Sequence, residues 1–164
     1  ILLHGFSKAW AMTGLRMGYA CAPEDIIEAM MKIHQYTIMC APTPSQEAAL
    51  EALADGDTAV QEMREAYRAR RNFLVQRLSE MGLPCVRPRG AFYAFPKIAG
   101  LGLDSREFAL RLLEEQAVAV VPGTAFGAQG EGFVRCSFAT AMGDLKCACD
   151  RIEALVQSLR SEGA

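Results

Sequence analysis

The stretch that decides the fold is GFSKAWAMTGLRMG, residues 5–18, which places one lysine and one arginine eight residues apart among small and apolar residues. Such surroundings disfavour an ammonium ion, so they favour a neutral, nucleophilic amine on Lys8. The planar guanidinium of Arg16 donates hydrogen bonds in pairs, which suits a phosphate dianion. An amine that can form a Schiff base and a nearby guanidinium together fit a cofactor that carries an aldehyde and a phosphate.

The composition around this stretch is that of an ordinary globular protein. The 164 residues include 17 Lys and Arg and 19 Asp and Glu, a net charge of −2, and 51% are hydrophobic. This balance argues against a basic nucleic-acid binder and against an acidic disordered chain. No apolar run approaches the roughly 20 residues that cross a membrane, and the first residues lack the basic start of a secretory signal.

The six cysteines indicate a reducing compartment. None forms a C-x-x-C pair, and only two histidines are available to complete a metal site. A chain of this length also needs no disulfide framework. We therefore expect free thiols that act as small core residues, no metal, and a cytoplasmic protein.

The element pattern predicts an α/β chain in two parts. The first part is expected to contain a short strand at residues 1–3, a loop at 4–14 and a second strand at 16–21. Two helices are expected to follow, at residues 23–34 and 45–54. Its two strands have no evident partner in the sequence. The second part is expected to contain a long helix capped by Asp57 at residues 57–81 and a strand pair at 85–87 and 91–95. An Asp-x-x-Glu capping box at 104–107 then precedes a helix that includes residues 108–113, and two strands at 118–121 and 133–138 and a last helix at 142–159 follow.

Residues 1–56 are therefore interpreted as the end of a large domain, and residues 57–164 as a small α+β domain with a sheet covered by helices. The chain opens without Met, inside an apolar run, so we expect it to be part of a longer protein that has lost its N-terminal portion. The long helix carries a group of arginines that is either a phosphate patch or, as we prefer, a solvated helix face: Arg68, Arg70, Arg71 and Arg77.

Residues 5–18 resemble the pyridoxal-phosphate attachment signature of class I and II aminotransferases and match it at every constrained position. The resemblance extends along the chain through four further landmarks: APTPSQ at 41–46, GAFY at 90–93, VPG at 121–123 and FVR at 133–135. It is greatest to the bacterial and archaeal aspartate and aromatic branch. The resemblance implies a truncated aspartate aminotransferase fold, with the end of the large domain followed by the whole small domain.

The resemblance also implies roles for individual residues. Lys8 matches the Schiff-base lysine, whose freed amine moves the proton between the α-carbon of the amino acid and the cofactor. Arg16 matches the arginine that binds the cofactor phosphate, with Ser7 as a neighbouring donor. Arg135 matches the arginine that binds the substrate α-carboxylate; an ion pair within its own domain is the alternative. Many relatives have Ser where this chain has Gly5, so one phosphate donor is absent.

The implied reaction transfers an amino group from an amino acid of aspartate or aromatic type to a 2-oxo acid such as 2-oxoglutarate, in a homodimer. In this family the acidic residue at the pyridine nitrogen, the stacking aromatic and the glycine-rich phosphate cradle precede the lysine, so the chain alone is expected to be inactive. Three alternatives stay open: another enzyme of this fold, such as a C–S lyase or decarboxylase; an aminotransferase-like effector domain of a transcription regulator; and a stand-alone binding module.

Overall fold

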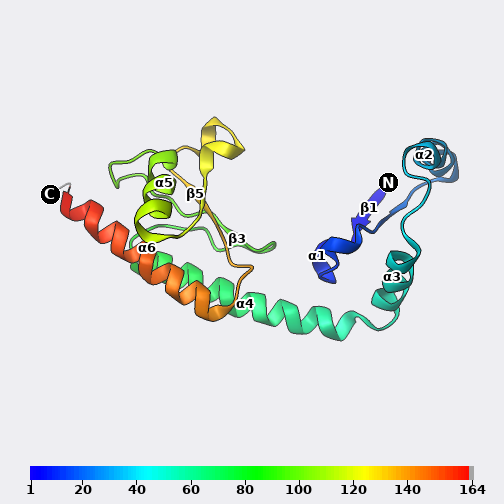
Figure 1. The fold of residues 1–164 in the computed structure, drawn as a ribbon, viewed down its shortest axis with the longest axis horizontal. Coiled ribbons are helices and arrows are strands. Elements are labelled where there is room, and N and C mark those ends of the chain that lie inside the picture. The colour runs from blue at the N-terminus through cyan, green and yellow to red at the C-terminus, as the bar shows by residue number, and fades with distance from the viewer. Residues whose placement is uncertain (163–164) are drawn as a thin grey trace. The chain divides into compact units, whose positions relative to one another are not determined.

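The computed structural model describes residues 1–162, which divide into two compact units, Ile1–Arg64 and a second unit from Glu65 onward. Figure 1 shows the elements of each unit. Among the described residues, no helix is both long enough and apolar enough to cross a membrane.

The first unit begins with a two-stranded antiparallel ribbon. Strand β1 (Leu2–Gly5) pairs with β2 (Gly18–Cys21), and the register runs from Leu2 opposite Cys21 to Gly5 opposite Gly18. The expectation that these strands lack partners is wrong, because they pair with each other. Gly18 permits the close approach, since a Cβ at this position would lie 2.9 Å from the carbonyl oxygen of His4.

The residues between the two strands are not the plain loop that the sequence predicts. They form a short helix, α1 (Phe6–Ala9), and a 3-10 turn, η1 (Thr13–Leu15). The backbone N–H of Phe6 donates to the carbonyl oxygen of Met17 at 3.1 Å and so continues the ribbon by one step. The segment that carries the lysine and the arginine is therefore folded back on itself at the end of the ribbon.

Two predicted helices complete most of the first unit, α2 (Glu24–Thr37) and α3 (Thr43–Asp55). Pro23 precedes α2, and Glu24 and Asp25 in its first turn suit the positive end of a helix dipole. No residue of α2 is buried, and several of its large apolar side chains are exposed: Met30, Met31, Ile33 and Tyr36. The first unit thus buries little of its apolar surface.

The second unit contains a three-stranded antiparallel sheet in the order β3-β5-β4. The strands are β3 (Tyr93–Ala94), β4 (Val121–Pro122) and β5 (Val134–Ser137). The strand predicted at residues 118–121 is therefore mostly irregular. The strand predicted at 85–87 is absent; this segment lies between Pro84 and Pro88, and proline supplies no N–H to a ladder.

Three helices pack with this sheet: α4 (Asp57–Glu80), α5 (Ser105–Gln116) and α6 (Met142–Glu162). The residues of α4 from Glu65 onward belong to the second unit. Two short 3-10 turns, η2 (Gly123–Phe126) and η3 (Ala128–Gly130), connect β4 to β5. Asp104 caps α5 as predicted, because its carboxylate accepts from the N–H groups of Arg106 and Glu107. In Figure 1, α6 runs beside the C-terminal part of α4.

One hydrophobic core unites the helices and the sheet of the second unit. Its buried members come from the three helices, from β3 and β5 and from the segments that connect them, and they include Leu74, Leu78, Phe108, Leu112, Val134, Phe138, Leu155 and Val156. Arg77 reinforces the packing of α4 on α6, because its Nη2 atom lies 2.8 Å from Asp150 and 2.9 Å from Glu153.

Candidate functional site

Lys8 lies on α1, directly after β1, and Phe6 anchors the segment that carries it. Phe6 is fully buried, and its ring contacts the rings of Trp10, at a centroid distance of 5.0 Å, and Tyr19, at 5.7 Å. The side chain of Lys8 is exposed. The apolar enclosure that the sequence predicts around this amine is therefore incomplete within the described residues.

Arg16 is held at the other end of the same segment. Its backbone is left-handed, with φ 53°, and its Nη1 atom donates to the carbonyl oxygen of Thr13 at 3.0 Å. Ala11 is also left-handed, with φ 55°. A left-handed backbone at a residue with a Cβ costs roughly 1–2 kcal/mol relative to a right-handed one, and such strained residues are concentrated at functional sites. The loop between Lys8 and Arg16 thus has a defined and costly backbone path.

Ser7 is half-buried on α1 beside Lys8, and α1 packs against η1, which precedes Arg16. The structure therefore brings Ser7, Lys8 and Arg16 together on one folded segment. An amine, a hydroxyl and a guanidinium on a short loop fit a group that carries an aldehyde and a phosphate, by the chemistry of the donors alone.

Arg135 lies on β5 in the second unit, and two aromatic rings stack on its guanidinium. Its Cζ atom lies 4.2 Å from the ring centroid of Tyr93 and 4.6 Å from that of Phe126. In residues 1–162 no carboxylate or hydrogen-bond acceptor engages this guanidinium, so the alternative of an ion pair within the domain is wrong for the described chain. The rings fix the plane of the group and leave its edge donors for a ligand.

Tyr93 and Phe126 are functional candidates that sequence reasoning missed. Tyr93 reaches Arg135 because β3 pairs with β5, with Tyr93 opposite Ser137 and one diagonal step from Arg135. Phe126 reaches it through η2. Neither contact has a signal in the sequence, because each depends on tertiary pairing of distant segments.

A carboxylate fixes the segment that carries Phe126. Glu131 accepts hydrogen bonds from the N–H of Ser105 at 2.9 Å, the hydroxyl of Ser105 at 3.0 Å and the N–H of Gly132 at 2.7 Å. These bonds, the one from the Ser105 backbone first, lower the pKa of Glu131. Gly123 at the start of η2 has no room for a side chain, since a Cβ there would lie 2.7 Å from the carbonyl oxygen of Phe133.

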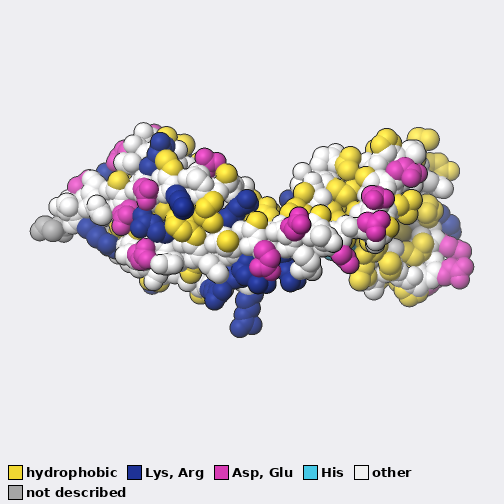
Figure 2. All heavy atoms as spheres, turned by 90° about the horizontal axis from the view of Figure 1, so that it is seen from below, with side chains coloured by type: hydrophobic (Ala, Val, Ile, Leu, Met, Phe, Trp, Pro, Cys, Tyr) yellow, Lys and Arg dark blue, Asp and Glu magenta, His cyan; other side chains and the backbone are white. Residues whose placement is uncertain are grey.

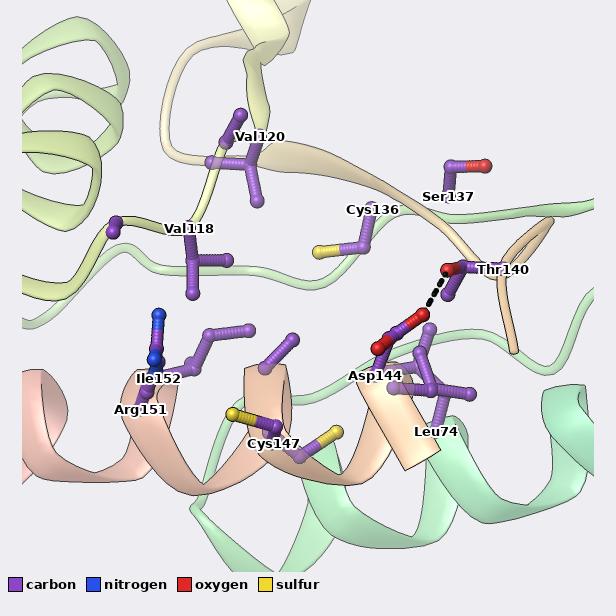
Figure 3. A pocket seen from close by; sticks show the side chains of 15 residues that line it. Leu74, Val118, Val120, Cys136, Ser137, Thr140, Asp144, Cys147, Arg151 and Ile152 are labelled. Atoms are coloured by element: carbon purple, nitrogen blue, oxygen red, sulfur yellow. Dashed lines mark hydrogen bonds between the residues drawn. The ribbon is translucent and has the colours of Figure 1, made fainter. Parts of the chain in front are cut away.

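The second unit also contains a cavity of about 440 Å³ between α6, β5 and the residues that precede β4 (Figure 3). Its walls are mainly apolar and sulfur-bearing. Burial raises the pKa of the Cys136 thiol to about 12 and that of Cys149 to about 11. Both thiols are therefore protonated near neutral pH and are packing groups rather than nucleophiles. Arg135 does not line this cavity.

Comparison with known proteins gives the family. The family model described as aminotransferase class I and II matches residues 1–152. The chain belongs to this family. It is 51% identical to the aspartate aminotransferase of Pyrococcus abyssi over 96% of its own length, and 49% identical to aromatic-amino-acid aminotransferase 2 of Thermococcus litoralis over the same share. It covers 41% of each of these relatives.

The same likeness holds in three dimensions. The crystal structure of the aromatic aminotransferase from Pyrococcus horikoshii matches 96% of this chain with a TM-score of 0.91 and 49% identity, and the chain covers 43% of that structure. The fold is therefore that of part of the aspartate and aromatic aminotransferases, in the truncated form that the resemblance implies. The chain spans about 40% of the length of the relatives that it matches.

Proposed function

We propose that this chain works within a pyridoxal-phosphate-dependent aminotransferase, which moves an amino group from an amino acid of aspartate or aromatic type to a 2-oxo acid such as 2-oxoglutarate. The observation that carries the proposal is the segment after β1, which presents Lys8, Ser7 and Arg16 on one strained, folded loop. The relatives support the substrate class, since their names cover both aspartate and aromatic amino acids.

In this proposal the loop holds the cofactor. Lys8 would hold the cofactor through its Nζ atom, which would replace the aldehyde oxygen with release of water, and the guanidinium of Arg16 and the hydroxyl of Ser7 would bind the phosphate. Once bound, pyridoxal phosphate supplies the electron sink for the α-carbon. The freed amine of Lys8 is then the base that takes the α-proton and returns it during transamination.

Arg135 is proposed to bind the α-carboxylate of the substrate. Stacking on Tyr93 and Phe126 fixes the plane of the guanidinium, so two parallel N–H groups can meet two carboxylate oxygens. Such pairing fixes the orientation of the amino acid, and a well-oriented reactant needs less entropy to reach the transition state.

We further propose that residues 1–56 belong to the large domain and residues 57–164 form the small domain of a homodimeric, cytoplasmic enzyme. Free thiols at all six cysteines support the location. The exposed apolar side chains of α2 support a need for further protein in the first unit. On this reading the chain by itself is inactive.

The test is a labelling experiment on the chain. The chain is incubated with pyridoxal phosphate, reduced with borohydride and digested, and the modified peptide is identified by mass spectrometry. We expect selective modification of Lys8 that free phosphate competes away. Lys8→Ala should abolish this labelling, and Arg16→Ala should remove the competition by phosphate. Lys32 is an exposed lysine of the same unit and is the internal control for non-selective labelling.

The labelling result is read together with an activity assay on the protein that carries this chain. There Lys8→Ala should reduce transamination to background, because the covalent link and the base are lost together. Equal labelling of Lys8 and Lys32 in that protein, or turnover by the Lys8→Ala variant, would contradict the proposal.

A further inference from the structure

Arginines are concentrated in one segment of the second unit. Residues 65–89 contain six arginines and two glutamates, a net charge of +4 in a chain whose net charge is −2. Seen from below, Lys and Arg side chains gather over α4 (Figure 2). Acidic side chains neutralise two of these arginines, Arg68 and Arg77. The solvated-face interpretation accounts for those two, but it does not account for Arg71, which meets Arg87 from the segment after α4.

Arg71 and Arg87 converge on one neutral atom, the side-chain oxygen Oδ1 of Asn72. Arg71 donates to it from Nε at 3.2 Å and from Nη2 at 2.9 Å, and Arg87 donates from Nη2 at 3.0 Å. Arg71 also donates from Nη1 to the carbonyl oxygen of Pro88 at 3.2 Å, which fixes its guanidinium against the loop. Within residues 1–162, neither arginine has a carboxylate partner.

The positive charges and N–H donors of Arg71, Arg87 and Asn72 outnumber the negative charges and acceptors that these residues meet. Two guanidinium groups share one amide oxygen, which carries only a partial negative charge, so the cations repel each other without a counter-charge. Arg87 has further N–H groups beyond the one that meets Asn72, and the amide NH₂ of Asn72 adds two donors. Arginine forks are well suited to pair with phosphate and carboxylate oxygens. An oxyanion would supply both the missing charge and the missing acceptors.

A groove of about 370 Å³ lies beside this pair, lined by Asn72, Val75, Gln76, Ser79, Glu80 and Arg87. Glu80 is its one acidic side chain among the described residues. It lies eight residues along α4 from Asn72, or about 12 Å at the helical rise, and its oxygens already accept from Gln76 at 2.9 Å and Arg77 at 3.5 Å. The end of the groove at Arg87 is therefore positively charged and has space for a small ligand.

We propose that Arg71, Asn72 and Arg87 form a binding site for a small oxyanion with two negative charges, either a phosphate group or a dicarboxylate. Two negative charges balance the two guanidinium groups that meet at Asn72. The site uses none of the residues that the proposed transamination uses.

The test replaces the neutral amide of Asn72 by a carboxylate. Asn72→Asp preserves the shape of the side chain and gives Arg71 and Arg87 a carboxylate partner. Binding of inorganic phosphate, and separately of succinate, is measured by isothermal titration calorimetry at low ionic strength. All chains compared carry Arg16→Ala and Arg135→Ala, which removes both anion sites of the proposed function, so the result does not depend on that function.

We expect at least one of the two anions to bind and to raise the melting temperature of the chain with Asn72. In Asn72→Asp the affinity should fall at least ten-fold, while the melting temperature without ligand rises, which shows that the variant is folded. Arg87→Ala should also weaken binding at least ten-fold. Arg106→Ala, at an exposed arginine of α5, is the matched control and should leave the affinity unchanged.

The relative affinity for phosphate and succinate identifies which kind of oxyanion the site prefers. If neither anion binds, or if binding keeps its affinity in Asn72→Asp or in Arg87→Ala, the assignment of this site is wrong.

Discussion

The two units of the chain differ in how much apolar surface each buries. In the first unit the buried side chains are few: Phe6, Ser45 and Ala49. In the second unit one core joins three helices and the sheet, and many of its side chains are fully inaccessible, among them Leu78, Leu112 and Leu155. The lysine loop thus lies in the weakly packed unit, and Arg135 lies in the well-packed one. The stable core and the residues of the proposed covalent chemistry therefore lie in different parts of the chain.

A pair of matched leucine truncations should give the largest effect and tests the difference in burial between the two units. Leu78 is 0% exposed in the second unit, whereas Leu53 is 58% exposed in the first. Leu78→Ala leaves a cavity in the core and should lower the free energy of unfolding by about 3–5 kcal/mol. Leu53→Ala should change it by no more than about 0.5 kcal/mol. Urea unfolding followed by circular dichroism measures both.

Trp10 is the single tryptophan, so its fluorescence reports on the first unit separately. Leu78→Ala should move the circular dichroism transition to lower urea more than it moves the fluorescence transition. The contrast between the units fails if Leu53→Ala is as destabilising as Leu78→Ala.

The next effect separates the proposed roles of the two units. Arg135→Lys keeps a positive charge but removes the planar fork and its stacking on Tyr93 and Phe126. Substrate binding by the protein that carries this chain should weaken by about 1.5–3 kcal/mol, the usual range for hydrogen bonds to a charged group. The dissociation constant of the amino acid measures this loss.

Labelling of Lys8 by pyridoxal phosphate and borohydride should be unchanged in Arg135→Lys, because that reaction depends on the loop of the first unit. A variant that lost labelling along with substrate affinity would show that the two roles are not separable.

A smaller effect concerns the pH dependence of the segment beside Arg135. Hydrogen bonds from Ser105 and Gly132 hold the pKa of Glu131 below its ordinary value of 4.5. Because the folded pKa is the lower one, the stability that this carboxylate contributes is present above pH 4.5 and is lost as the pH falls through the folded pKa. Glu131→Gln keeps the shape and removes the charge.

The variant should therefore melt a few degrees below the wild type at pH 7, and the gap should close toward pH 3. Glu114→Gln, at an exposed glutamate of α5 outside its first turn, is a control for the general loss of a negative charge. A gap that stays constant from pH 7 to pH 3 would show that the carboxylate charge of Glu131 plays no part.

The lysine loop shows how much the sequence could predict. The fixed spacing of Lys8, Arg16 and the surrounding small residues predicted the fold and the candidate residues, because this signature lies within one short stretch of sequence. The pairing of β1 with β2 could not be predicted, since two short strands have no partner specified by their own patterns and the close approach at Gly18 emerges only in the folded ribbon.

The surroundings of Arg135 show what the sequence could not predict. The resemblance alone made Arg135 a candidate. Its two stacking rings come from β3 and η2, and sheet register and a tightly packed turn bring them to it. The exposure of Lys8 was also missed, because a run of apolar neighbours in sequence does not say on which side of the loop they lie.

The smallest effect concerns position 5, where this chain has glycine and the resemblance implies serine in many relatives. Gly5 has φ −126°, which any residue adopts, and a Cβ there would find its nearest atom, the carbonyl oxygen of Met17, at 3.9 Å. Glycine is therefore not required by the backbone. Gly5 is also the N-cap of α1, a position where serine is at least as favourable as glycine.

Gly5→Ser should accordingly change the free energy of unfolding by no more than about 0.5 kcal/mol. If the loop binds the cofactor phosphate, the added hydroxyl should strengthen retention of pyridoxal phosphate several-fold, measured by dialysis and absorbance of the bound cofactor. Gly14→Ser adds a hydroxyl where no atom lies within 4 Å of the new Cβ, and it should give no such gain. Equal gains at both positions would mean that the phosphate does not lie beside residue 5, and the roles proposed for Ser7 and Arg16 would then need to be reassigned.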